Sequence, residues 1–199
     1  MSTPHAPAQS PPLAAIGGSA GSFPVLQELL GLLPASFPGA LLVVMHVERD
    51  RHSLLPDLLA RATELTVLPA RGGERPRAGH VYVAPPDRHL VVRPGPRLSL
   101  SSAEPECFSR PAVDPLFASL AEVCGAGAVA VVLSGMGHDG SRGAAEVHRR
   151  GGTVVAQSAA TASHGSMPAA AIATGGVAHV LAPAEVAELL MKLLTPAPR

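Results

Sequence analysis

The stretch AVAVVLSGMGHDGSRGAAEVHRRGGTVVAQ, residues 128–157, decides the expected fold. It begins with an apolar run at 128–133 that is long enough for a buried strand, and a glycine-rich turn follows at 134–140. The next residues, to about Arg150, predict a helix, and 153–157 predicts a second buried strand. Strand, turn, helix and strand in this order are typical of a parallel sheet covered by helices.

The same alternation extends over the rest of the chain. We expect further strands at 13–17, 40–46, 65–68, 81–84, 89–92, 97–101 and 177–181, and helices at 24–33, 54–62, 114–123 and 184–194. Ser53 is the expected N-cap of the second of these helices. A Pro- and Gly-rich turn at 94–96 predicts a hairpin between its flanking strands. The fold class is therefore α/β, with a doubly wound, mainly parallel sheet and a small antiparallel hairpin.

Length and composition narrow the class of protein. The chain has 199 residues, of which 47% are hydrophobic, and this suits one domain, predicted over 13–195 after a disordered tail at 1–12. Fifteen acidic residues balance fifteen basic ones, so nothing indicates nucleic-acid binding. No apolar run is long enough to span a membrane, and there is no signal-peptide pattern. With two cysteines and no disulfide framework, we expect a cytoplasmic protein without membrane insertion.

Three residues with reactive side chains stand at the ends of expected strands. They are Ser19, His46 and Asp139. Active sites of open α/β sheets form at the carboxyl ends of strands, so these side chains could meet although they are far apart in sequence. A serine hydroxyl becomes a useful nucleophile when a histidine takes its proton and a carboxylate orients that histidine. The glycines around Ser19 also permit a tight turn that exposes its hydroxyl.

Two other kinds of site compete for these segments. Residues 135–140, GMGHDG, match the dinucleotide fingerprint G-x-G-x-x-G between a strand and a helix. That fingerprint also requires an acidic residue at the end of the next strand, where this chain has Gln157 and Ser158. The nine histidines invite a metal interpretation, but no H-E-x-x-H pair or Cys/His spacing supports it, so we predict no metal and no cofactor.

Several segments, in one order along the chain, resemble the catalytic domain of chemotaxis receptor methylesterases (CheB-like proteins). They are IGGSAGSFPVLQELLGLLP (16–34), LLVVMH (41–46), VYVAPPDRHL (81–90), RPAVDPLFASLA (110–121) and the region from VVLSGMGHDGSRG onward (131–181). Ser19 stands at the nucleophile position, His46 at the histidine position and Asp139 at the aspartate position of that family. The resemblance covers nearly the whole chain from residue 14.

This resemblance implies an activity. The family hydrolyses glutamate 5-O-methyl esters on the cytoplasmic helices of methyl-accepting chemoreceptors, releases methanol, and often deamidates receptor glutamines. Ser19 would attack the ester, His46 would act as base and then acid, and Asp139 would orient His46. The backbone N–H of Met136 matches an oxyanion contact of the family, and that of Ala20 is a plausible second donor.

Further site residues and one alternative function remain open. His89 and Arg110 are candidates for lining the substrate, although His89 could be a structural histidine and Arg110, like Asp114, could serve the helix that follows. The family often carries an N-terminal receiver domain, for which the twelve residues before the first strand are too few. We therefore expect control by a separate regulatory protein or by receptor conformation. The alternative function is a catalytically silent CheB-like domain that binds a partner in a sensory pathway.

Overall fold

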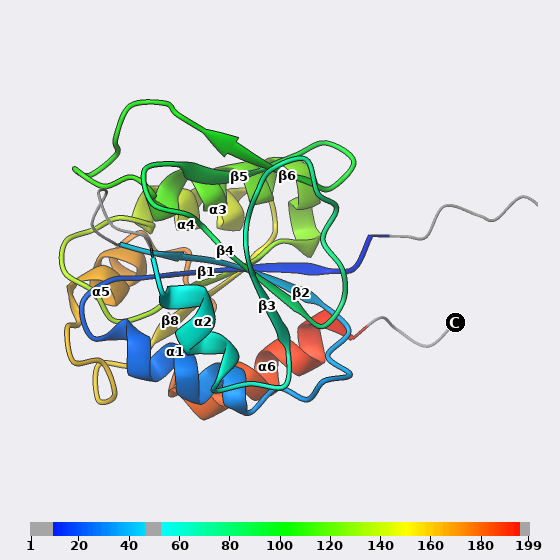
Figure 1. The fold of residues 1–199 in the computed structure, drawn as a ribbon. Helices are drawn as coiled ribbons and strands as arrows, with labels where there is room; N and C mark the ends of the chain where they lie inside the picture. The colour runs from blue at the N-terminus through cyan, green and yellow to red at the C-terminus, as the bar shows by residue number, and fades with distance from the viewer. Residues whose placement is uncertain (1–9, 47–52, 196–199) are drawn as a thin grey trace, which may run out of the picture.

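A seven-stranded parallel sheet forms the centre of the molecule. The computed structural model describes residues 10–46 and 53–195 (Figure 1). The strands lie in the order β3-β4-β2-β1-β7-β8-β9, and every neighbouring pair is parallel. Their bounds are β1 Leu13–Gly18, β2 Ala40–Met45, β3 Thr66–Pro69, β4 His80–Val83, β7 Val129–Val132, β8 Thr153–Gln157 and β9 His179–Leu181. The prediction of a doubly wound, mainly parallel sheet is confirmed.

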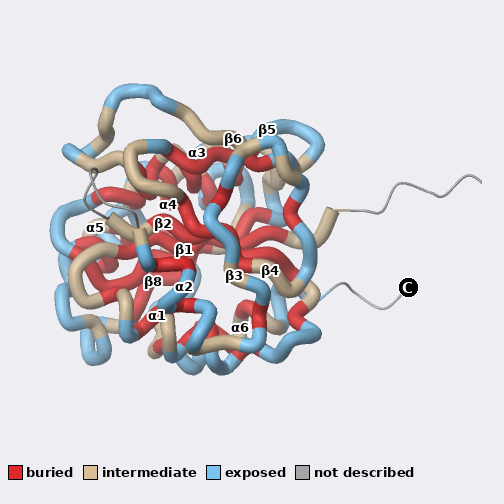
Figure 2. The backbone as a smooth tube through the Cα atoms, viewed as in Figure 1, coloured by how far each residue is buried: buried red, intermediate tan, exposed pale blue. Residues whose placement is uncertain are grey.

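Helices cover both faces of this sheet. They are α1 Ser22–Gly31, α2 Leu55–Ala60, α3 Val113–Cys124, α4 Ser141–Arg149, α5 Ser166–Ala173 and α6 Pro183–Leu194. One face packs against α1, α2 and α6, and the other against α3, α4 and α5. The inner strands β1, β2, β4, β7 and β8 are almost wholly buried, as Figure 2 shows for the tube at the centre of the molecule, whereas the edge strands β3 and β9 are largely exposed. Burial on both faces explains why the inner strands read as unbroken apolar runs in the sequence.

The predicted hairpin is confirmed as a separate two-stranded sheet. Its antiparallel strands are β5 His89–Arg93 and β6 Arg97–Ser101, and β5 packs against α3. The hairpin therefore lies outside the main sheet, on the side of α3 and α4 (Figure 1). It carries the chain from β4, on one side of the sheet, toward β7, on the other.

The position of β1 beside β7 marks where a site is expected. From β1 the chain continues to β2 on one side, and from β7 it continues to β8 on the opposite side. The connections that leave the carboxyl ends of β1 and β7 therefore diverge. In open α/β sheets, ligands bind at such a point.

Three details of the sequence prediction need correction. Helix α5 was not predicted, because its segment SMPAAAIA holds a proline and a run of alanines and shows no apolar stripe. Helix α2 has Leu54 rather than Ser53 as its N-cap, although the Ser53 hydroxyl accepts a hydrogen bond of 3.3 Å from the N–H of Leu55. Strand β9 begins at His179 rather than at residue 177.

Some expectations fall on parts of the chain that the structure does not describe. Residues 1–9 of the predicted tail lie outside the described residues, as do residues 47–52 after β2. The division into a tail at 1–12 and a domain at 13–195 stays a prediction. None of the described helices has the length and apolar composition needed to cross a bilayer.

Candidate active site

Ser19 lies in the turn between β1 and α1. Its backbone N–H donates to the carbonyl of Ser134 at 2.9 Å, and its own carbonyl accepts from the backbone N–H and the hydroxyl of Ser22, at 3.0 and 2.6 Å. Gly21, the residue before α1, has φ +75°, a left-handed conformation that favours glycine. The backbone of Ser19 is therefore fixed, while within the described part of the chain its hydroxyl makes no hydrogen bond.

His46 follows β2, the strand beside β1. Gly18 pairs with Met45 in the parallel register, and the N–H of His46 donates to the carbonyl of Gly18 at 3.3 Å. Ser19 and His46 are thus the next residues along two paired strands. The His46 side chain is 18% exposed, and its Nε2 lies 2.7 Å from Oδ2 of Asp139. Nε2 of His46 is therefore the ring nitrogen engaged with the carboxylate.

Asp139, in the turn after β7, is 1% exposed, and both of its carboxylate oxygens take part in hydrogen bonds. Besides His46, its carboxylate accepts from the N–H groups of Val113 at 2.7 Å and Asp114 at 3.0 Å, in the first turn of α3. Burial alone would raise the pKa of Asp139, but the hydrogen bonds from His46 and the two N–H groups outweigh it and lower that pKa. Asp139 is therefore a fixed anion that holds one nitrogen of His46.

Two backbone N–H groups near Ser19 are available to a ligand. Among the backbone hydrogen bonds of the described residues, none uses the N–H of Ala20 or Met136 as donor. Gly135, which precedes Met136, lies directly against Ser19, because a Cβ placed on Gly135 would be 3.0 Å from that of Ser19. Ala20 follows Ser19 directly in the chain, and Met136 follows the glycine that packs against Ser19.

Ser134 is a buried residue of this region that the sequence interpretation did not single out. Its hydroxyl donates to the carbonyl of Ala20 at 2.9 Å and accepts from the N–H of His164 at 3.0 Å. Its N–H donates to Oε1 of Gln157 at 2.8 Å. Ser134 therefore joins the turn after β1 to the segment before α5. A serine at the end of an apolar run was the only sequence signal for it.

His89 and Arg110 hold backbone segments in this structure. His89 is 1% exposed, accepts from the N–H of Ala112 at Nδ1, and donates from Nε2 to the carbonyl of Glu104, both at 3.1 Å. Arg110 binds Asp87 through Nε and Nη2, and donates from Nη1 to the carbonyls of 102 and 103. The structure thus gives both side chains a positioning role for the segment 102–112, and their contact with substrate stays a prediction.

Comparison with known proteins places this arrangement in a family. The sequence model of CheB methylesterase matches residues 14–190. The chain belongs to the CheB methylesterase family. It is 44% identical, over 179 residues, to protein-glutamate methylesterase/protein-glutamine glutaminase 3 of Anaeromyxobacter dehalogenans, and 42% identical, over 190 residues, to the corresponding protein 1 of Myxococcus xanthus. These alignments cover 89% and 94% of this chain, but 52% and 55% of the two relatives.

The fold agrees with the same family. The crystal structure of the Thermotoga maritima CheB methylesterase catalytic domain superposes with a TM-score of 0.89 at 35% identity, covering 92% of this chain and 99% of that one. This CheB-family chain therefore spans about half the length of the two relatives above and nearly all of the solved catalytic domain.

A pocket of about 920 Å³ lies away from these residues, at the edge formed by β3 and β4, and none of Ser19, His46 and Asp139 lines it.

Proposed function

We propose that this chain is a serine-type esterase that hydrolyses glutamate 5-O-methyl esters on methyl-accepting chemoreceptors and releases methanol. The observation that carries the proposal is the partly buried contact of 2.7 Å between His46 and Asp139, together with a serine whose hydroxyl has no partner among the described residues. The relatives are named protein-glutamate methylesterase/protein-glutamine glutaminase, which supports the same reaction and adds deamidation of receptor glutamines.

In the proposed mechanism, the Ser19 hydroxyl attacks the ester carbonyl while Nδ1 of His46 takes its proton. The negative charge of the tetrahedral intermediate develops on the former carbonyl oxygen, where the N–H groups of Ala20 and Met136 would donate to it. Protonated His46 then gives its proton to the leaving methoxide, and methanol departs. A water molecule, activated by the same nitrogen, hydrolyses the acyl-enzyme and restores Ser19.

Asp139 has a defined part in this mechanism. Its carboxylate holds the Nε2–H of His46, so that Nδ1 faces Ser19 unprotonated, and it stabilises the imidazolium that forms. Because three donors fix the carboxylate, it needs no reorganisation when that positive charge appears. No step of this proposed mechanism uses a metal or a cofactor.

The partner in this proposal is the helical cytoplasmic part of a chemoreceptor, and the location is the cytoplasm. An ester side chain on a helix surface is exposed, so it can reach a serine at the end of a sheet.

The test is methanol release from methylated receptor membranes. Ser19→Ala should lower turnover by several orders of magnitude without unfolding the protein. Ser163→Ala is a matched control, because Ser163 is an exposed serine whose Cβ lies near the Gly21 position. If Ser19→Ala keeps more than about a tenth of wild-type turnover, Ser19 is not the nucleophile. If the wild-type protein binds receptor membranes and releases no methanol, the chain is a silent binding domain.

A further inference from the structure

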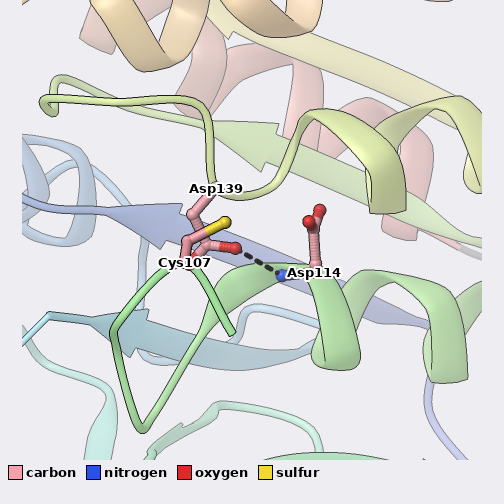
Figure 3. A group of neighbouring side chains, drawn as sticks. All are labelled: Cys107, Asp114 and Asp139. Carbon is pink, nitrogen blue, oxygen red and sulfur yellow. Dashed lines mark hydrogen bonds between the residues drawn. The ribbon is translucent and has the colours of Figure 1, made fainter. Parts of the chain in front are cut away.

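Three ligand-type side chains from separate segments meet beside the candidate active site. Cys107 follows β6, Asp114 lies in the first turn of α3, and Asp139 follows β7. One ligand atom from each lies within 4.8 Å of the other two. In Figure 3 the Cys107 sulfur lies over the Asp139 carboxylate, and the Asp114 side chain stands beside them. His138, an exposed residue outside this group of three, forms a hydrogen bond of 3.6 Å between its Nε2 and the Cys107 sulfur.

The two carboxylates of this group form a buried pair with little compensation for Asp114. Asp114 is 4% exposed. Its Oδ1 accepts from the N–H of Gly143 at 2.7 Å, whereas the only partner of Oδ2 among the described residues is Nε of Arg142, at 3.6 Å. That arginine is largely exposed and also pairs with Glu106. Burial raises the pKa of Asp114, and the neighbouring charge of Asp139 raises it further. This direction is expected for a buried carboxyl group that has no close cation.

The backbone fixes Cys107 toward this pair. Glu106 and Ser109 exchange backbone hydrogen bonds of 3.1 and 2.8 Å, and the two residues between them, Cys107 and Phe108, have φ values of +49° and +63°. This is a tight turn in which non-glycine residues occupy left-handed conformations, and such strain persists where the surroundings impose it. The four bonds of Arg110 to Asp87 and to the carbonyls of 102 and 103 anchor the base of the same segment.

The kinds of donor atom select the cation. A thiolate favours Zn²⁺ over Mg²⁺ or Ca²⁺, and carboxylates complete many zinc sites. No sequence spacing indicates this site, because its ligands come from three segments.

We propose that Cys107 and the carboxylates of Asp114 and Asp139 bind one Zn²⁺, and that its binding inhibits the esterase. Zn²⁺ on the Asp139 carboxylate places positive charge beside the group that should stabilise the His46 imidazolium. Turnover should therefore fall, while KM changes little because the cation does not occupy the position of the ester. Inhibition rests on the proposed esterase function, whereas Zn²⁺ binding does not.

Zn²⁺ binding is tested first, by competition with a chromogenic chelator on the full chain previously treated with EDTA. The wild-type protein should bind one Zn²⁺ per chain, and Cys107→Ser should bind at least about tenfold more weakly. Cys124→Ser is the matched control, since Cys124 is the second cysteine and lies at the far end of α3. With Co²⁺ in place of Zn²⁺, a thiolate-to-metal charge-transfer band should appear in the wild type and in Cys124→Ser, and not in Cys107→Ser. Equal affinities in all three proteins would overturn the site.

Inhibition is tested second, by methanol release with and without Zn²⁺. Saturating Zn²⁺ should lower wild-type turnover at least tenfold, and EDTA should restore it. Cys107→Ser, which should keep the basal rate, should resist the same Zn²⁺ concentration. Zn²⁺ binding without inhibition would overturn the regulatory half of the proposal. A chain without esterase activity would refute the proposed function, while the binding measurement would still decide the metal site.

Discussion

The turns after β1 and after β7 meet at the same edge of the sheet, but they are built differently. The first, around Ser19, has a fixed backbone and presents a hydroxyl that has no hydrogen bond within the described residues. In the second, the side chains of Ser134 and Asp139 are buried. The Ser134 hydroxyl and both carboxylate oxygens of Asp139 form hydrogen bonds. In the proposed mechanism, the first turn therefore supplies the reacting hydroxyl, and the second turn supplies side chains that are held in fixed positions.

The largest expected effect comes from removing the charge in the rigid turn. Asp139→Asn keeps the shape of the side chain but favours the wrong tautomer of His46, a change that costs about 10⁴ in turnover in a well-studied serine protease. We expect a loss of similar order here, measured as kcat for methanol release, with KM almost unchanged. A variant that mainly raises KM would show that Asp139 contacts substrate instead.

The next effect tests how tightly the two turns are packed together. A Cβ at Gly135 would lie 2.1 Å from the sulfur of Met167 and 3.0 Å from the Cβ of Ser19, so Gly135→Ala requires either α5 or the Ser19 turn to shift. Overpacking of this kind costs about 1–3 kcal/mol of unfolding free energy. Gly127→Ala is the control, because nothing lies within 4 Å of its Cβ position and its φ is not left-handed. Urea unfolding measures both variants. Equal stabilities would mean that the contact between the turns is loose.

The smallest expected effect is on the pH dependence of the free energy of unfolding, which should differ between the neighbouring carboxylates of Asp139 and Asp114. The pKa of Asp139 is lowered by its hydrogen bonds, so the stability it contributes is present above the ordinary Asp pKa of about 3.9 and is lost as pH falls through its folded value. The pKa of Asp114 is raised by burial, so its charge destabilises the fold near neutral pH and is relieved as pH falls toward about 3.9.

The measurement is urea unfolding between pH 3 and 7, with EDTA present, of the wild type and of the two Asp→Asn variants at 114 and 139. Below about pH 4, the advantage of the wild type over Asp139→Asn should shrink. From neutral pH down to about 4, the wild type should gain relative to Asp114→Asn. Differences that move in the same direction would contradict the assigned environments.

Both turns were predictable from the sequence because each is a glycine-rich segment between an apolar run and a helix. The positions of Ser19 and Asp139 were predictable for the same reason, and that of His46 was predictable because it ends the apolar run 40–46. Pattern alone left a dinucleotide site at 135–140 open, although Gln157 and Ser158 stand where the fingerprint requires an acidic residue. The family assignment and the contact of Asp139 with His46 favour the esterase interpretation.

What the sequence could not predict depends on contacts between distant segments. The hydroxyl of Ser134 binds the carbonyl of Ala20, 114 residues away, and no local pattern encodes such a pair. The full burial of His89 depends in the same way on the segment 104–112 folding over it. Helix α5 was missed because its stability comes from burying Met167, Pro168 and Ala171 rather than from a periodic apolar stripe.

The central claim is that His46 activates Ser19, and covalent labelling tests it most directly. A fluorophosphonate reacts with a serine hydroxyl only when a neighbouring base activates it, and peptide mass spectrometry locates the adduct. We expect one adduct per chain, on Ser19, in the wild-type protein, and none on the same timescale in a folded His46→Gln variant. Labelling at another residue, or labelling of Ser19 at the same rate without His46, would contradict it.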